Sequence, residues 1–452
     1  MSSAVQVKKD YVKLSILCII LLFTVVIFTY KPWVGSNRSP IKHDVSGYYL
    51  YLPSILIYHD VNAKFLAQKP EILHAGIFTY TKENNEGFIN KYPIGLAFAY
   101  LPFFLLAHVA SLLFNFTADG YSTLYRIAMA FHPIVYLGIG LYYLSKSLRF
   151  YFNDMAIILT LFSLTLGTNL FFYSTFNGNM PHVYLFTLLS IIIYYTIIWH
   201  KQPELKTTLL LFSCIGLATI IRPTAFQFIL IPLLYNYQNL HNQFLLFFSQ
   251  RKNIALGLVV FSCILFLLFT YWKLVTGSFI YYSYEKEADS FDFLHPHIIE
   301  VLIGFKKGLF IYTPILLFAL IGFWKLKEKI PSFHTAVVFF LISYIYVVAS
   351  WWCWWYGGSF GMRALIETYA ILAFPMASFF NFILSKNLFY KIGIEVIALL
   401  FICLNLFQSA QHLKSVIHYE GMNYKAYCFV FGKLNLSEEE KVKLSELLKE
   451  KN

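Results

Sequence analysis

Charged residues are scarce in this sequence. Only 13% of the 452 residues are charged, whereas 58% are hydrophobic and the mean hydropathy is +0.62. A soluble domain has an apolar share of roughly 45–50%, so the composition excludes an ordinary soluble protein and predicts an all-α polytopic membrane protein. The net charge of +12 forms no continuous basic face, because Lys and Arg lie in short clusters between apolar runs. We interpret it as a topology signal and expect no nucleic-acid partner.

Cysteine is also rare, and its spacing favours neither a disulfide framework nor a zinc site. Four of the six cysteines lie inside apolar runs, where a thiol behaves as a small hydrophobic group. These are Cys18, Cys214, Cys263 and Cys403. Cys353 and Cys428 fall on one predicted membrane face and could form a disulfide. The only support for this pairing is that the number of cysteines is even.

Apolar runs fill most of the chain, and about 20 apolar residues suffice for a membrane-spanning helix. The first run follows three lysines, lacks a small-x-small cleavage site and precedes further runs, so we read it as an uncleaved signal anchor. The runs are 14–30, 94–114, 121–144, 154–174, 181–199, 207–221, 224–240, 253–274, 308–324, 333–350, 364–384 and 391–409.

Five short basic loops between these runs are predicted to be cytoplasmic by the positive-inside rule. They are SKSLRFYFND, HKQPELK, SQRKN, KLKEK and SKNLFYK. Each membrane crossing moves the chain to the other side. With a cytoplasmic N-terminus, all five loops can therefore be cytoplasmic only if one early run does not cross the membrane. The stretch KYPIGLAFAYLPFFLLAHVASLLF contains two prolines and His108 and lacks flanking basic clusters, so we expect 94–114 to lie in the outer interface. About 11 spans remain.

One integral domain, residues 1–409, accounts for these runs, with outer loops at 31–120 and 275–307. Residues 410–452 are predicted to be a short extracytoplasmic tail in which Ser437 and Glu440 form the capping box of an amphipathic helix. The span interiors are nearly free of charge, whereas a transporter would hide ionisable groups there. Polar and aromatic residues gather on the outer face instead, which favours a catalyst at the membrane surface.

Asp44 is the leading catalytic candidate. It follows the first span closely, and the run YYLYLPSILIY behind it would hold a carboxylate at the depth of lipid head groups. The structural alternative is a helix N-cap, and Ser46 would cap a helix beginning near Gly47 equally well. Weaker candidates in the same loop are His43, Asp60, Glu71 and His74.

Four basic residues on the outer face are candidates for binding a donor phosphate. Arg222 has no partner among its neighbours in IIRPTAF, so its guanidinium needs an anion, either a phosphate or a lipid head group. Lys306 and Lys307 lie in a predicted outer loop, although the positive-inside rule favours lysines in cytoplasmic loops. Binding of a phosphate or of an anionic outer lipid would explain their position. Arg363 follows the glycine-rich run WWCWWYGGSFGM and could pair with Glu367 one helical turn later.

Aromatic and amide side chains on the same face are candidates for contacting the sugar or the acceptor. Flat rings beside polar donors suit sugar rings, although tryptophans also form interfacial belts and FNGNMPH also fits a plain polar turn. The candidates are His43, Tyr48, Asn177, Asn179, His182, Tyr282, Trp354, Trp355 and Tyr356.

Together these features resemble the GT-C superfamily of integral membrane glycosyltransferases. The shared features are an acid in the first outer loop, interfacial helices before the second span, an Arg-Pro break and a second outer loop leading into GLFIYTP. KYPIG, GLATIIRPTAF and the region from TGSF to GLFIYTPILLFALIGF look like bacterial members related to glycosyltransferase family 39, of the protein mannosyltransferase and aminoarabinose transferase type. The resemblance implies a GT-C-like bundle with interfacial helices in the first outer loop.

The resemblance also implies an activity: transfer of a sugar from a polyprenyl-phosphate carrier to a lipid, glycan or protein acceptor, outside a bacterial inner membrane. Asp44 would match the catalytic acidic residue of the first outer loop. From its placement and the outer cations we further hypothesise that Asp44 acts as the base and that the sugar is inverted. The turn FNGNMPH lacks the acid that superfamily members often carry there, so no cofactor is expected and a divalent metal is left open. The alternatives are a transporter or flippase of lipid-linked sugars and a glycan polymerase or ligase.

Overall fold

The computed structural model describes residues 10–35, 38–69, 79–81, 87–283 and 290–449. Within these ranges the chain is mostly helical, with one antiparallel pair of short strands, β1 (Thr79–Thr81) and β2 (Phe88–Asn90). The helices are α1 (Tyr11–Tyr30), α2 (Asp44–Leu56), α4 (Gly95–Leu113), α5 (Thr123–Leu148), α6 (Asp154–Leu166), α7 (Pro181–Lys201), α8 (Leu205–Ile221), α9 (Leu230–Leu234), α10 (Leu240–Ser249), α11 (Arg251–Thr276), α12 (Ile298–Ile303), α13 (Leu309–Tyr312), α14 (Leu317–Lys329), α15 (Pro331–Ala349), α16 (Tyr369–Ile383), α17 (Leu388–Leu413), α18 (Tyr424–Val430) and α19 (Glu438–Lys449). Short 3-10 helices are η1 (Lys64–Gln68), η3 (Phe172–Ser174), η4 (Pro223–Ile229), η5 (Tyr237–Asn239), η6 (Pro314–Leu316) and η7 (Arg363–Thr368).

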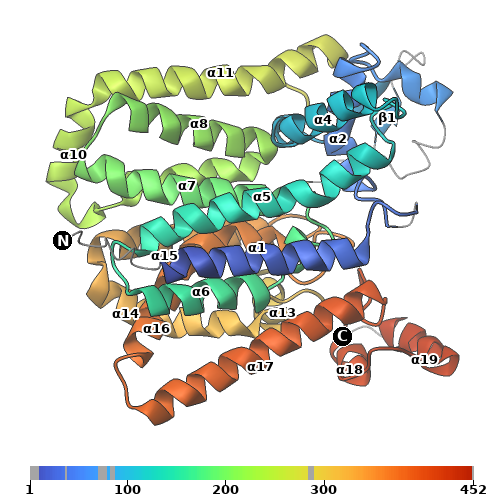
Figure 1. Cartoon of the computed structure of the whole chain (residues 1–452). Helices are drawn as coiled ribbons and strands as arrows, with labels where there is room; N and C mark the ends of the chain where they lie inside the picture. The colour runs from blue at the N-terminus through green and yellow to red at the C-terminus, as the bar shows by residue number, and fades with distance from the viewer. Residues whose placement is uncertain (1–9, 36–37, 70–78, 82–86, 284–289, 450–452) are drawn as a thin grey trace, which may run out of the picture.

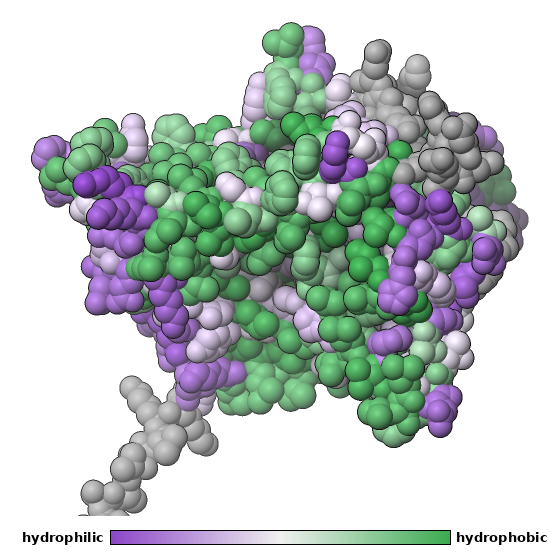
Figure 2. Space-filling model, turned by 90° about the horizontal axis from the view of Figure 1, so that it is seen from above, coloured by the Kyte–Doolittle hydropathy of each residue, from purple (hydrophilic) through white to green (hydrophobic). Residues whose placement is uncertain are grey.

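The long helices form a bundle whose two ends differ. Among the described residues, eight helical segments are long and apolar enough to cross a membrane: α1, α4, α5, α7, α11, α15, α17 and the continuous segment of η7 and α16. In Figure 1 the long helices run mainly from left to right, and α2, β1, α18 and α19 gather at the right-hand end. Figure 2 shows a broad hydrophobic surface between two hydrophilic ends. The predicted all-α membrane protein is therefore confirmed.

Burial separates central helices from peripheral ones. In the most apolar part of each segment, 83% of the η7–α16 residues and 72% of the α7 residues are buried, against 17% for α11 and 22% for α17. The two poorly buried helices expose large apolar side chains, among them Leu258, Phe266 and Leu399. Lipid tails suit such surfaces, because they demand no hydrogen bonds.

Helix α4 begins and ends at the same end of the bundle as α2. At its start, a Cβ added to Gly95 would lie 2.3 Å from the carbonyl carbon of Ile220, next to the last residue of α8. Farther along, His108 shares a hydrogen bond of 2.5 Å with Tyr125 near the start of α5. The loop after α4 then accepts hydrogen bonds from two tyrosines of the first outer loop. Helix α4 is also long and apolar enough to span, so the expectation that 94–114 lies in the interface stays a prediction.

Three predicted spans are less regular than their hydropathy suggests. Run 154–174 leaves the α-helix at Leu166 and ends with η3, run 224–240 consists of η4, α9 and η5, and run 308–324 passes through α13 and η6 before α14. Pro223 and Pro314 open two of the 3-10 helices, because a proline lacks the N–H of a regular helix and is tolerated in a first turn. The irregular segments 167–180, 222–229 and 304–316 adjoin the candidate site described below.

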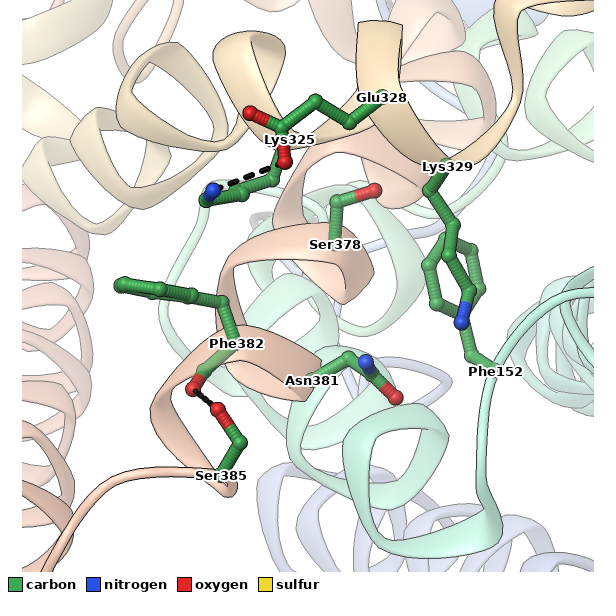
Figure 3. Close-up of a pocket in the computed structure, with 8 residues that line it drawn as sticks. All are labelled: Phe152, Lys325, Glu328, Lys329, Ser378, Asn381, Phe382 and Ser385. Atoms are coloured by element: carbon green, nitrogen blue, oxygen red, sulfur yellow. Dashed lines mark hydrogen bonds and ion pairs between the residues drawn. The ribbon is translucent and has the colours of Figure 1, made fainter.

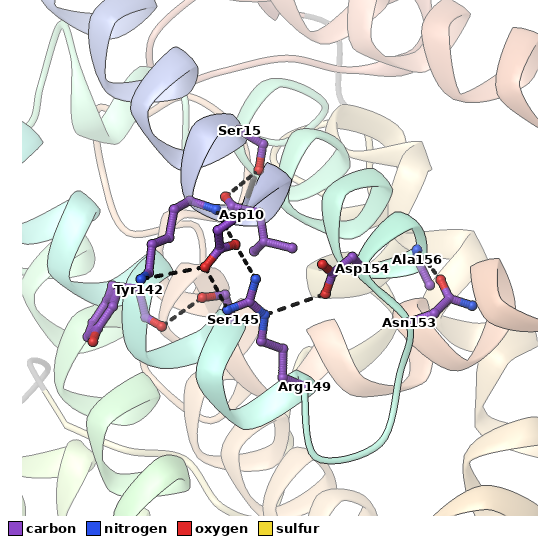
Figure 4. Close-up of polar contacts among 10 residues, drawn as sticks. Asp10, Ser15, Tyr142, Ser145, Arg149, Asn153, Asp154 and Ala156 are labelled. Carbon is purple, nitrogen blue, oxygen red and sulfur yellow. Dashed lines mark hydrogen bonds and ion pairs between the residues drawn. The ribbon is translucent and has the colours of Figure 1, made fainter. Parts of the chain in front are cut away.

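At the other end of the bundle, an ion-pair network joins α1, α5 and α6 (Figure 4). Arg149 lies after α5 and pairs with Asp10 ahead of α1 and with Asp154 at the start of α6, 3.5 Å away. The hydrogen bonds from Arg149 lower the pKa of Asp10 to about 2. Asn153 caps α6 by accepting a hydrogen bond from the Ala156 N–H at 2.9 Å.

Close helix packing depends on a glycine where α14 meets α16. A Cβ on Gly322 would lie 1.8 Å from the carbonyl oxygen of Pro375, so only glycine lets the two backbones approach this closely. One turn away, the rings of Phe318 and Phe379 stack with centroids 5.0 Å apart.

The tail and the cysteines can be compared with expectation directly. Ser437 and Glu440 exchange the two hydrogen bonds of a capping box, at 2.9 and 3.2 Å, at the start of α19. All six cysteines are free, so the optional pairing of Cys353 with Cys428 does not form.

Candidate active site

Asp44 is the first residue of α2, and both of its carboxylate oxygens have partners. Tyr92 donates its hydroxyl to Oδ1 at 2.8 Å, and the Arg363 guanidinium lies 3.4 Å from Oδ2. The Asp44 side chain is still 27% exposed, so a substrate can reach it. The N-cap interpretation is wrong, because His43 holds the cap position without a side-chain hydrogen bond. Ser46 is not the N-cap either, because it lies inside α2 and donates its hydroxyl to the His43 carbonyl at 2.6 Å.

Tyr92 reaches the acid because Gly47 leaves room for its ring. A Cβ at Gly47 would lie 2.2 Å from Cδ2 of Tyr92. Asn90, the last residue of β2, holds both sides of this contact: its amide donates to the Gly47 carbonyl at 2.7 Å and its Oδ1 accepts from the Tyr92 N–H at 3.1 Å. The Tyr48 ring packs on Tyr92 with centroids 4.5 Å apart. The β-strand pair and α2 thus orient the partner of Asp44.

Arg222 and Glu367 form a buried ion pair between distant parts of the chain. The Arg222 Nη1 atom lies 2.8 Å from Oε1 of Glu367, a side chain with no exposed surface. His182 approaches Oε2 at 3.4 Å, and the Arg222 guanidinium lies 5.1 Å from the ring centroid of Tyr356. The prediction that Arg222 lacks a partner is wrong. The predicted pair of Arg363 with Glu367 is also wrong, because tertiary packing pairs each of them elsewhere.

Helix η7 joins the two ion pairs, since Arg363 and Glu367 lie four residues apart within it. Arg363 interacts electrostatically with Arg222 as well as with Asp44. Tyr173, a residue that the sequence analysis missed, contacts the same region: it accepts a hydrogen bond from the Phe360 N–H at 3.0 Å, and its ring packs 5.1 Å from that of His182. The site therefore combines a partly exposed carboxylate with two guanidinium groups.

The two candidate lysines differ in what they contact. The Lys306 ammonium lies 3.4 Å from the ring centroid of Trp355 and 5.7 Å from that of Trp354, and partial burial lowers its pKa. Lys307 is 2% exposed and donates to the carbonyls of Ser359 and Tyr419, the latter at 2.5 Å. Burial, with the nearby Arg363 charge, lowers the pKa of Lys307 to about 7. Lys307 thus fastens the loop before η7 to the C-terminal tail, and Lys306 is the more accessible cation.

The FNGNMPH turn packs against the segment that leads into Asp44. Asn179 is buried and donates its amide to the Pro40 carbonyl at 3.0 Å. Asn177 and Asn179 also line a small cavity of about 20 Å³ with Lys42, enough for one water. This turn supports the segment that leads into Asp44, and His182 supports Glu367.

The remaining sugar or acceptor candidates differ in their surroundings. His43 is exposed with φ at 50°, and Tyr282 is 58% exposed. Trp354 stacks on His297 at 5.5 Å, while Tyr356 adopts φ of 55°. Glu71 and His74 lie outside the described residues.

Two participants could have been suspected from the sequence. Tyr92 belongs to KYPIG, one of the stretches that carry the family resemblance, and Glu367 is the acid nearest the Trp-Gly run. Nothing in the sequence singles out Tyr173. Within the described ranges, no three His, Cys, Asp or Glu side chains lie together as a metal-binding group.

The comparison with known proteins shows the fold. One similar solved structure is the archaeal oligosaccharyltransferase AglB from Archaeoglobus fulgidus, in complex with an inhibitory peptide and a dolichol-phosphate, with a TM-score of 0.53 and 12% identity. The match covers 96% of this chain and 59% of AglB, so this chain spans about three fifths of that protein. No family model and no curated protein sequence matches the chain. At this identity the similarity shows a shared fold, so this chain has the helical membrane-protein architecture of that structure.

Proposed function

We propose that this protein is an inverting glycosyltransferase that moves a sugar from a polyprenyl-phosphate donor to an acceptor hydroxyl or similar nucleophile at the extracytoplasmic membrane face. The observation that carries the proposal is the Asp44 carboxylate, partly exposed and held by Tyr92 and Arg363 at one end of an apolar bundle. A carboxylate fixed at such a surface suits a base that serves a membrane-bound donor.

The reaction breaks one bond at the sugar and forms another. The acceptor oxygen attacks the anomeric carbon while Asp44 takes its proton, and the bond from that carbon to the donor phosphate oxygen breaks. The electron pair of that bond leaves with the polyprenyl phosphate, so attack from the opposite face inverts the sugar. The hydroxyl of Tyr92 holds one oxygen of Asp44, which leaves the carboxylate oriented for proton transfer.

Cations near Asp44 would neutralise the charge that grows on the leaving phosphate. Arg222 and Arg363 each already face a carboxylate. Lys306 forms no ion pair with a carboxylate among the described residues, and it lies over Trp355. It is therefore our first choice for the donor phosphate, with the two arginines adding positive potential and Lys307 acting indirectly.

Two further observations support the choice of donor and family. The similar AglB structure contains a dolichol-phosphate, a lipid phosphate of the polyprenyl type. Tyr92 of KYPIG contacts Asp44, which gives a physical reason for that stretch; the relationship to glycosyltransferase family 39 stays part of the proposal. The short basic loops favour a topology in which the Asp44 end lies on the extracytoplasmic side of a bacterial inner membrane.

The test is release of free polyprenyl phosphate from a panel of polyprenyl-phosphate sugars by the purified full-length protein in lipid. We expect release by the wild type and its loss in Asp44→Asn, with donor binding largely retained. The matched control is Asp292→Asn, the same change at an exposed acid in the second outer loop, which should stay active. Turnover by Asp44→Asn would remove Asp44 from the role. Donor binding without release from any sugar, even with acceptors added, would favour the transporter.

A further inference from the structure

A cavity of about 260 Å³ lies at the end of the bundle opposite Asp44, and Figure 3 shows the residues that line it. It is lined by the last turns of α14 and α16 and by Phe152, in the loop before α6. Arg363 and Asn381 mark opposite ends of the continuous η7–α16 segment, so the length of that segment separates the cavity from the candidate active site. The reaction proposed above does not use this cavity.

Three groups that can donate hydrogen bonds line this cavity. Ser378 is 3% exposed, and its hydroxyl has no hydrogen-bond partner among the described residues. The Oδ1 of Asn381 accepts from Asn153 at 3.0 Å, which leaves the Asn381 amide nitrogen to donate. The Lys329 ammonium forms no ion pair or hydrogen bond with any described residue. A buried donor without a partner is costly unless something satisfies it.

The charge balance of the cavity is positive. The carboxylate of Glu328 is paired with Lys325 at 2.8 Å, so these two charges offset each other. The Lys329 ammonium remains uncompensated. The hydroxyl of Ser385 is occupied by the Phe382 carbonyl at 2.7 Å. An ammonium, an amide and a hydroxyl around one space are the donors that a phosphate group accepts from.

From this geometry we infer a second binding site, for the phosphate head group of an anionic phospholipid. The volume is several times the roughly 30 Å³ share of one water in the liquid, which suits a head group and is too small for lipid chains. Trp324 beside the cavity is 66% exposed, with the Lys325 ammonium 4.0 Å from its ring centroid. An exposed tryptophan next to lysine is typical of a membrane interface, so the lipid chains would lie over this apolar surface.

Topology agrees with the inferred ligand. Two of the predicted cytoplasmic loops, SKSLRFYFND and KLKEK, contribute Phe152 and Lys329 to the same cavity, and SKNLFYK begins at its rim with Ser385. Anionic lipids in the cytoplasmic leaflet attract such basic segments. The site would secure the inner ends of α14 and α16 to that leaflet.

The experiment measures binding to the full-length, delipidated protein in detergent micelles, by native mass spectrometry and thermal unfolding. The probes are phosphatidylglycerol, phosphatidylcholine and glycerol 3-phosphate. We expect phosphatidylglycerol to bind and raise the unfolding temperature, and phosphatidylcholine to bind at least tenfold more weakly. Lys329→Met should weaken phosphatidylglycerol about tenfold, and Ser378→Ala about threefold.

The matched control is Lys327→Met, which removes another exposed lysine from the same helix outside the cavity. It should leave phosphatidylglycerol binding unchanged. If glycerol 3-phosphate binds as tightly as phosphatidylglycerol, the site is supported and its ligand is a soluble phosphate compound. If only the lipid binds, the ligand is a membrane phospholipid. Equal losses in Lys327→Met and Lys329→Met, or equal binding of both phospholipids, would overturn the inference.

Discussion

Replacing Glu367 with Gln tests whether the buried ion pair organises the candidate site. Gln keeps the shape of the side chain but removes the negative charge, so the Arg222 guanidinium loses its counter-ion. Removing one partner of a buried pair typically costs about 3–5 kcal/mol. Arg222 keeps 20% of its surface exposed, and water screens part of the loss. We therefore expect the free energy of unfolding to fall by about 3 kcal/mol, at the low end of that range.

A double-mutant cycle separates this electrostatic cost from lost packing. The variants are Glu367→Gln, Arg222→Met and both together, and the assay is denaturant unfolding in mixed micelles. The double variant has no unpaired buried charge, so it should be more stable than the sum of the two single losses by about 2 kcal/mol. Glu300→Gln is the control, because Glu300 is 48% exposed and near His297, and it should cost less than about 0.5 kcal/mol. Additive losses in the cycle, or a Glu367→Gln protein as stable as the wild type, would refute the reasoning.

Three shorter predictions concern other parts of the molecule. Tyr92→Phe should lower kcat about tenfold through loss of one hydrogen bond to a carboxylate with little change in stability; an unchanged kcat in the donor-release assay would limit Tyr92 to packing. Burial lowers the pKa of Lys307 from 10.5 to about 7, so the unfolded chain binds more protons between these values and stability should rise with pH across that window, by at most about 1.4 kcal/mol per pH unit. Lys307→Met should flatten this rise in unfolding measurements made at several pH values, and a slope equal to that of the wild type would contradict it. Gly322→Val would push a side chain into the Pro375 carbonyl and should prevent folded protein from accumulating, whereas Gly393→Val, with open space around it, should be tolerated when both are compared by size-exclusion chromatography.

The candidate site illustrates how far sequence reasoning reached. Asp44 was found because it lies close to the end of a recognisable apolar run, a relation that is local in the chain. The partners of Asp44 were not found, since Tyr92 is 48 residues away and Arg363 is 319 residues away. The same limit explains the error at Arg222: its apolar neighbours suggested an unpaired cation, yet Glu367 reaches it from 145 positions later.

The sequence by itself determined the class of protein and the approximate positions of its helices, because hydropathy is a property of each short window of residues and the bilayer selects windows of the right length. It also determined the capping of α19, since the residues of a capping box lie within one turn. Only the tertiary structure decided where the apolar runs become irregular, which charges pair, and that KYPIG lies against Asp44. These features depend on contacts between segments far apart in the chain, and helix packing creates such contacts without leaving a local pattern in the sequence.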